Sequence, residues 1–253
     1  MSTENQTQFE IPFDVIELPS KGLLYPGKVS TCKVGYLNMS DENVLTSPNL
    51  IKNGKVLDVL LERKVKDSPI PVRDMLVGDR NAIMIWLRAT GYGEMYPVKL
   101  MDPNTGEDFE YEVDLNDLKT KPLGAEPDEN GLFDFELPRS KKKIKFKLLT
   151  VGDEADIIKR SEARDKKLKS QVSNTLTYRM ETQIVSVDGN SDKNQISQFL
   201  QFMPAFDSLK FREYSDSIEP GIDMSVDVEG PSGETFPSLI QIGLNFFWPN
   251  AGV

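Results

Sequence analysis

Short apolar segments alternate along the chain with segments in which apolar residues recur every three or four positions. The first pattern is typical of strands with one buried face, and the second of helices that bury one face. The helical spacing is clearest at Val56–Val65 and Thr175–Ile184. A short strand that runs into a capped helix start precedes each of them, at Val34–Glu42 and Phe146–Glu154. The pattern predicts an α+β fold of short strands and a few helices.

These segments recur in the same order in both halves of the chain. Leu18–Gly22 reads Leu-Pro-Ser-Lys-Gly, and Leu137–Lys141 reads Leu-Pro-Arg-Ser-Lys. The strand-to-helix segments and the helices named above form two more pairs. A helix start in each half forms the next pair, at Met75–Arg80 and Met203–Ser208. A β-hairpin in each half forms the last pair, at Val98–Phe109 and Val226–Phe236. Five pairs in one order rarely arise by chance, so we interpret the chain as two duplicated modules. The offset between copies rises from 119 to 128 residues, which places an insertion in the second copy, at Asp188–Asn194.

A segment rich in proline, glycine and charge, Lys119–Gly131, separates the two copies. The predicted organisation has four parts: a flexible N-terminus at 1–17, a first module at 18–118, a linker at 119–136, and a second module with an aromatic C-terminal tail at 137–253. Each module is expected to contain a strand, three helices and a β-hairpin.

The tips of the two predicted hairpins contain Pro103 and Pro231 at equivalent places. They resemble the turns of a zinc ribbon, in which paired cysteines place thiolates on one ion. Neither tip contains a cysteine, and the oxygens of Asp102, Asn104 and Thr105 are too few for a good calcium site. We therefore expect zinc-ribbon-like hairpins that lack metal ligands and bind no metal.

The 253 residues include one cysteine, Cys32, and no histidine. An intramolecular disulfide, a cysteine metal cluster and all histidine-dependent hydrolytic chemistry are therefore excluded. None of the 40 acidic residues lies in a distinctive catalytic motif. We predict a non-enzymatic protein without catalytic residues or cofactors. A carboxylate-based hydrolase is the alternative, because a glycosidase needs only two acids in a cleft.

The formal net charge is −10, which disfavours binding to a phosphate backbone and favours basic partners. One basic run, Arg139–Lys147, alternates lysines with Ile144 and Phe146, as expected of a strand with a solvated face. Lysines at a sheet edge commonly block unwanted pairing. A nucleic-acid-binding module that uses this run is a second alternative. The polar N-terminus and the lack of a long apolar run predict a protein that stays in the cytosol, without a signal peptide or a membrane span.

The segment Ile240–Pro249 is strongly apolar and aromatic, although chain ends are usually polar. Clustered Phe and Trp residues are typical anchors of interfaces. We expect the tail to pack on its own module and to leave part of its aromatic surface for a partner. The predicted partner-binding residues are Phe246, Phe247, Trp248, Pro249 and Tyr92. The first hairpin has no such tail, so the second module is the preferred docking module.

Four short motifs resemble the baseplate hub subunits of T-even-type contractile-tailed bacteriophages. They are Leu18-Pro-Ser-Lys-Gly-Leu-Leu-Tyr25, Gly78-Asp-Arg80 leading into Leu87-Arg88, Gly91-Tyr-Gly93 and Phe246-Phe-Trp-Pro249. The resemblance covers about Leu18 to Pro249. Some members of that family carry cysteine pairs at the hairpin tips, which this chain lacks.

The resemblance implies a late viral protein of the tail baseplate hub, with a structural or a chaperone-like role in assembly. Its implied partners are other phage tail and hub proteins, without nucleic acid, membrane or small-molecule substrate. Its implied location is the host cytoplasm during assembly. The resemblance leaves open whether the protein stays in the virion.

Overall fold

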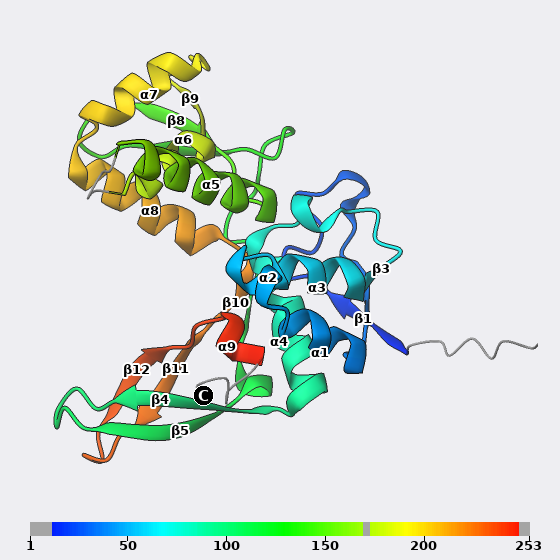
Figure 1. The fold of residues 1–253 in the computed structure, drawn as a ribbon. Helices are drawn as coiled ribbons and strands as arrows, with labels where there is room; N and C mark the ends of the chain where they lie inside the picture. The colour runs from blue at the N-terminus through cyan, green and yellow to red at the C-terminus, as the bar shows by residue number, and fades with distance from the viewer. Residues whose placement is uncertain (1–11, 169–172, 248–253) are drawn as a thin grey trace, which may run out of the picture.

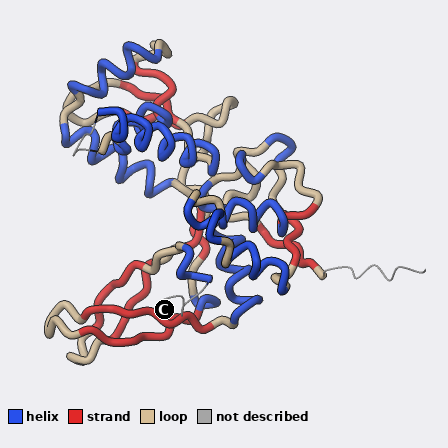
Figure 2. The backbone as a smooth tube through the Cα atoms, viewed as in Figure 1, coloured by secondary structure: helices blue, strands red, loops and turns tan. Residues whose placement is uncertain are grey.

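The computed structural model describes residues 12–168 and 173–247, in which helices alternate with small antiparallel sheets (Figures 1 and 2). These elements form three lobes. Two lobes each combine a three-stranded sheet with helices, and the third is built from two β-hairpins (Figure 1). The fold is mixed α+β, and the sequence-based fold class is confirmed.

The first lobe contains a sheet in the order β1-β2-β3, with three helices between its second and third strands. Its elements are β1 (Phe13–Glu17), β2 (Thr31–Gly35), α1 (Met39–Leu45), α2 (Pro48–Lys52), α3 (Val56–Lys64) and β3 (Val65–Lys66). Helix α4 (Val77–Tyr92) follows. The predicted flexible segment 1–17 needs correction at 13–17, because these residues pair along their whole length with β2. Residues 1–11 lie outside the described part.

The second lobe repeats this order, with a sheet arranged β7-β8-β9 and helices between its second and third strands. Its elements are β7 (Phe133–Glu136), β8 (Lys143–Phe146), α5 (Val151–Leu168), α6 (Thr175–Gln183), β9 (Ile184–Val187), α7 (Lys193–Phe202) and α8 (Ala205–Ile218). The predicted linker 119–136 also needs correction. It contains β7 and β6 (Thr120–Lys121), and β6 pairs with β10 (Gly221–Ile222).

The third lobe brings together two hairpins that are far apart in sequence. They are β4 (Met95–Met101) with β5 (Asp108–Asp114), and β11 (Ser225–Glu229) with β12 (Thr235–Leu239). Asp102 joins their tips, since it accepts hydrogen bonds from the amides of Asn104 (2.8 Å) and Ser232 (3.0 Å). The rings of Phe109 and Phe236 meet edge to face, 6.2 Å apart. Polar as well as apolar contacts therefore hold the tips together.

The two halves use the same polar contacts at matching positions. Asp79, the third residue of α4, accepts hydrogen bonds from the Ser20 amide (2.9 Å) and hydroxyl (2.6 Å) in the turn after β1. Asp207, the third residue of α8, accepts hydrogen bonds from the amides of Arg139 (2.7 Å) and Ser140 (2.9 Å) in the turn after β7. These correspondences support our interpretation that one module is present twice.

The helix starts of the two halves also correspond. Asn38 and Asp41 form a capping box at α1, and Thr150 and Asp153 exchange the same two kinds of hydrogen bond at α5. In the second half, α7 lies between β9 and α8, whereas the described residues between β3 and α4 in the first half contain no α-helix. Helix α7 begins at Lys193, within the segment Asp188–Asn194 in which the sequence places an insertion.

Helix α4 lies where the lobes meet and is buried on most of its circumference. The backbone at Pro220 packs so closely against α4 that Gly78 is required, because a Cβ atom at position 78 would lie 1.7 Å from the carbonyl oxygen of Pro220. Trp86 is partly buried against the main core, and its ring lies 5.1 Å from that of Tyr36. Trp86 therefore contributes to the core.

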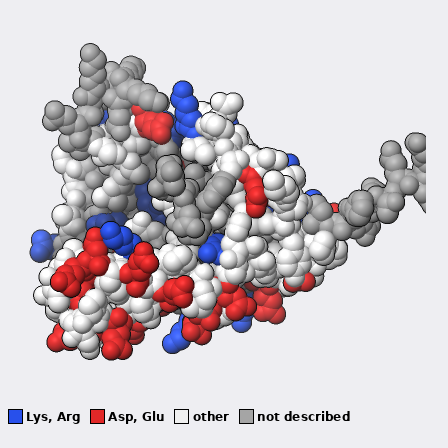
Figure 3. Space-filling model, turned by 60° about the horizontal axis from the view of Figure 1, so that its bottom comes forward, with Lys and Arg blue, Asp and Glu red and all other residues white. Residues whose placement is uncertain are grey.

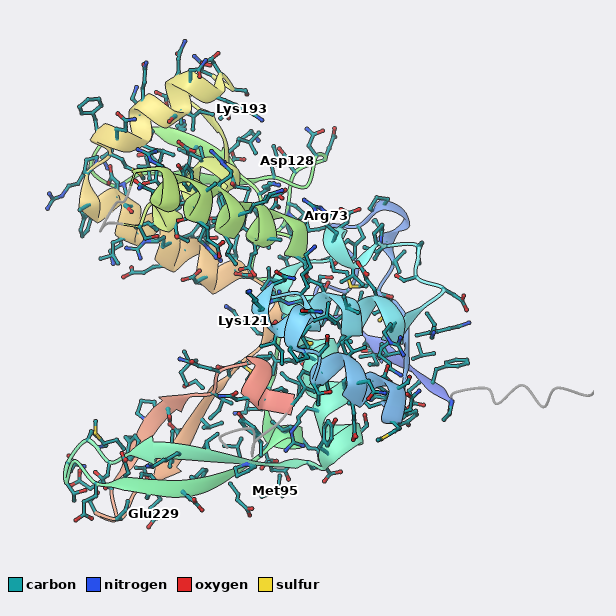
Figure 4. All side chains as sticks on the ribbon, viewed as in Figure 1. Arg73, Met95, Lys121, Asp128, Lys193 and Glu229 are labelled. Atoms are coloured by element: carbon teal, nitrogen blue, oxygen red, sulfur yellow. The ribbon has the colours of Figure 1, made fainter. Side chains whose placement is uncertain are left out.

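Glu219 follows α8 at the junction of the lobes, a region in which Lys121 also lies (Figure 4). Burial raises the pKa of Glu219 from 4.5 to about 7. The positive charges of Arg179 and Lys121 oppose this shift, and the carboxylates of Asp216 and Glu154 add to it. The side chain is therefore partly protonated at neutral pH.

We expect Glu219 to make the folded chain less stable as the pH rises from about 4.5 to about 7. In this window the folded state binds one proton more than the unfolded state, so the free energy of unfolding falls by at most about 3 kcal/mol. Glu219→Gln should remove this contribution, whereas Glu229→Gln, at an exposed position of β11, should not. Urea unfolding at several pH values measures the difference. Equal pH dependence in both variants would contradict the assignment.

Candidate functional site

Arg88 lies near the C-terminal end of α4 and is only 2% exposed. Its guanidinium donates hydrogen bonds to the carbonyl oxygens of Phe246 (2.9 Å), Gly93 (2.7 Å) and Met95 (3.4 Å). These carbonyls belong to the C-terminal segment, the end of α4 and the start of β4. One side chain thus joins three parts of the fold, and we call this arrangement the Arg88 clamp.

The charge of Arg88 is stabilised although no carboxylate is among its described hydrogen-bond partners. Burial lowers the pKa of Arg88, but an arginine starts so far above neutral pH that it stays charged. The rings of Tyr92 and Tyr96 lie 5.7 and 5.5 Å from the guanidinium carbon, within the range of cation–π attraction. The negative end of the helix dipole also favours a cation here.

The aromatic tail packs against the first half of the chain. Phe246 and Phe247, in α9 (Leu244–Phe247), are 0% and 1% exposed. The ring of Phe246 meets Tyr96 at 4.9 Å and Phe247 at 5.6 Å. Packing on the tail's own module was expected, and this needs correction, because Arg88 and Tyr96 both come from the first module.

The five predicted docking residues therefore differ in their placement. Phe246 and Phe247 are buried within the chain, so contact with a partner would require the tail to leave α4. Trp248 and Pro249 lie outside the described residues. Tyr92 is 38% exposed and lies beside the Arg88 clamp.

Two neighbouring residues complete the accessible surface of this region. Met95, which supplies a carbonyl to the clamp, is 46% exposed. Burial raises the pKa of Tyr92, and the carboxylates of Glu42 and Asp41 raise it further against the opposing charge of Arg88. The phenol therefore stays neutral and its hydroxyl remains a hydrogen-bond donor. The sequence places Arg88 in one of the motifs that carry the family resemblance, but it does not indicate this role, because Arg88 binds backbone carbonyls rather than particular side chains.

The basic run Arg139–Lys147 is largely neutralised by carboxylates. Lys142 pairs with Asp188 at 2.6 Å, and Lys147 pairs with Asp153 at 2.8 Å. Lys145 contacts Asp128 at 2.8 Å, which lowers the pKa of that carboxyl to about 2. The central part of the run forms β8 (Lys143–Phe146), the middle strand of its sheet, so the interpretation of the lysines as protection of a sheet edge is wrong.

Two hollows open on the described surface. The first, of about 440 Å³, lies between the helical lobes, and Asp74 is the one carboxylate that lines it. The second, of about 470 Å³, lies beside α8 and contains Glu136 and Glu213, each within 4.0 Å of a lysine. The described part of the chain contains no group of three or more His, Cys, Asp or Glu side chains that could hold a metal ion.

Comparison with known proteins places the chain in a family. A family model described as T4 bacteriophage base plate protein matches residues 17–235. No curated protein and no solved structure matches the chain significantly. None of the described helices has the length and apolar character that a bilayer crossing requires. Because the family model covers most of the sequence, the chain belongs to the T4 bacteriophage base plate protein family.

Proposed function

We propose that this protein is a non-enzymatic structural or assembly protein of the baseplate hub that acts by binding other hub and tail proteins. The observation that carries the baseplate role is the family match over residues 17–235. Its proposed locations are the host cytoplasm during assembly and the tail of the virion. The finer assignment to the hub rests on the resemblance of the motifs at Leu18–Tyr25 and Phe246–Pro249.

The proposed docking surface is the exposed edge of the Arg88 clamp, formed by Tyr92 and Met95. Trp248 and Pro249, which lie outside the described residues, are proposed as further partner contacts. A tyrosine with a neutral hydroxyl offers both apolar area and a hydrogen-bond donor, which suits an interface. Arg88 supports this surface by fixing the end of α4 and the start of β4. The surface therefore needs little ordering when a partner binds, which lowers the cost of association.

The two other functions have weaker support from the same geometry. Nucleic-acid binding needs free positive charge, yet Lys142, Lys145 and Lys147 are each bonded to a carboxylate. A carboxylate hydrolase needs one acid held protonated beside a second, ionised acid. In the hollow beside α8, each of the two acids, Glu136 and Glu213, lies within 4.0 Å of a lysine.

Co-expression with the other baseplate proteins of the same phage, followed by size-exclusion chromatography, tests the proposal. We expect a stable complex with at least one identified hub protein. The double variant Tyr92→Ala, Met95→Ser should weaken that complex at least about tenfold. The control variant Ile51→Ser, Leu176→Ser changes exposed apolar residues on α2 and α6 and should bind normally.

The outcome that contradicts the proposal is the absence of a complex with every baseplate protein tested. Mass spectrometry of purified virions then separates the two roles. A fixed copy number in the virion indicates a structural component, and absence from the virion indicates an assembly factor.

A further inference from the structure

The second lobe exposes an apolar ridge where α7 meets α8. Phe202 is 85% exposed, Phe206 is 39% exposed and Leu209 is 41% exposed. Phe206 and Leu209 lie three positions apart, on the same side of α8. Phe202 is the last residue of α7, and the extended residues Met203 and Pro204 join it to α8. Exposed phenylalanines this close in sequence are unusual on a surface that contacts only water.

The corresponding face of α4 is covered by the chain itself. Phe206 matches Gly78 at the offset of 128 residues, and the backbone of Pro220 and Gly221 lies directly over Gly78. Val77, which matches Ala205, is buried, whereas Ala205 is exposed. The start of α4 is thus covered by backbone in the first half. In the second half Phe206 is 39% exposed, and of the described side chains that of Arg139 lies over its ring.

A groove runs beside the ridge. It has a volume of about 470 Å³, and the residues that line it are Phe135, Glu136, Pro138, Phe206, Lys210, Glu213 and Tyr214. The rings of Phe135 and Tyr214 stack there at 4.8 Å. A ridge and a groove that lie side by side on one face are self-complementary under a two-fold axis, because each copy can place its ridge in the groove of the other.

Charge also favours a second copy at this face. Lys210 pairs with Glu213 at 2.7 Å, Lys141 approaches Glu136 at 4.0 Å, and Arg139 lies over the ring of Phe206. The face is therefore locally balanced, although the chain as a whole carries −10.

The hairpin lobe has the opposite character. Its segments 95–114 and 225–239 contain nine acids and one lysine, and acidic side chains gather on the face that it presents (Figure 3). Two copies would repel each other strongly through this lobe. Two copies with the same net charge would therefore repel each other less at the ridge on the second lobe than at the hairpin lobe.

We propose that the ridge of Phe202, Phe206 and Leu209 binds a second copy of this chain through a two-fold interface. In this arrangement the ridge of each copy occupies the groove of the other, and Lys210 faces the partner's Glu213. This self-association is separate from hetero-partner binding at the Arg88 clamp. The two surfaces lie on different lobes, so a dimer leaves the clamp accessible.

Sedimentation velocity of the purified chain over a wide range of concentrations tests this proposal without any other baseplate protein. We expect a reversible dimer. The double variant Phe206→Asp, Leu209→Asp should raise its dissociation constant at least about a hundredfold. The control variant Ile158→Asp, Leu176→Asp changes exposed apolar residues of α5 and α6 in the same lobe and should dimerise normally. Circular dichroism verifies that each variant is folded.

A charge exchange provides a second measurement that does not remove apolar surface. Lys210→Glu alone should weaken the dimer, and the double variant Lys210→Glu, Glu213→Lys should restore it. A chain that is monomeric at all concentrations, or a dimer that Phe206→Asp, Leu209→Asp leaves unchanged, overturns the proposal. Neither result would bear on hetero-partner binding through Tyr92 and Met95.

Discussion

Replacing Asp79 with alanine should lower the free energy of unfolding by about 3–5 kcal/mol, because it leaves several buried donors without an acceptor. The carboxylate is completely buried and accepts hydrogen bonds from the Ser20 amide, the Ser20 hydroxyl and the Tyr25 hydroxyl (2.6 Å). The Tyr25 oxygen in turn accepts a hydrogen bond from the Leu76 amide at 2.8 Å. The loss of Asp79 would therefore loosen both the turn after β1 and the start of α4.

Urea unfolding of three variants measures this effect. Asp207→Ala at the equivalent position should cost less, because Asp207 accepts two described hydrogen bonds, both from backbone amides of a partly buried turn. Asp117→Ala, at an exposed position of the 3-10 turn Leu115–Asp117, should change stability by less than about 0.5 kcal/mol. If Asp79→Ala were as stable as Asp117→Ala, the buried network would not contribute to stability.

Arg88→Leu should release the aromatic tail from α4 and lower the free energy of unfolding by about 2–4 kcal/mol. Leucine preserves apolar volume but leaves the carbonyls of Phe246, Gly93 and Met95 without their donor. The hydrogen bond from Arg88 to Phe246 holds the tail, and the hydrogen bonds to Gly93 and Met95 hold the junction between α4 and β4. The variant should therefore loosen both. The variant should therefore also bind hub proteins more weakly through Tyr92 and Met95.

Limited digestion with chymotrypsin detects release of the tail directly. Phe246 and Phe247 are buried in the parent chain and should be cut slowly, whereas Arg88→Leu should expose them to cleavage. The matched control is Arg212→Leu, since Arg212 donates a hydrogen bond within its own helix, to the Ser208 carbonyl. Unchanged cleavage and unchanged stability in Arg88→Leu would show that aromatic packing alone holds the tail.

Much of the local structure follows from the order of residues. The alternation of apolar residues in Val98–Phe109 and Val226–Phe236 predicts hairpins, and hairpins form there. The helical spacing at Val56–Val65 predicts α3 almost to the residue. These features depend on neighbours within a few positions, so a single sequence contains the required information. The strand β1 was missed because a five-residue edge strand beside a polar terminus has too weak a pattern.

The sequence by itself determined the mixed fold class, the hairpins and the lack of histidine chemistry, because these depend on composition and on short-range patterns. Only the tertiary structure decided how these parts meet. The Arg88 clamp joins residues 158 positions apart, and it buries Phe246 against the first half rather than the second. Likewise, Gly78 and Phe206 occupy matching helix positions, yet one is covered by backbone and the other is exposed. Burial of a side chain depends on which distant segment packs over it, and no pattern of neighbouring residues specifies that contact.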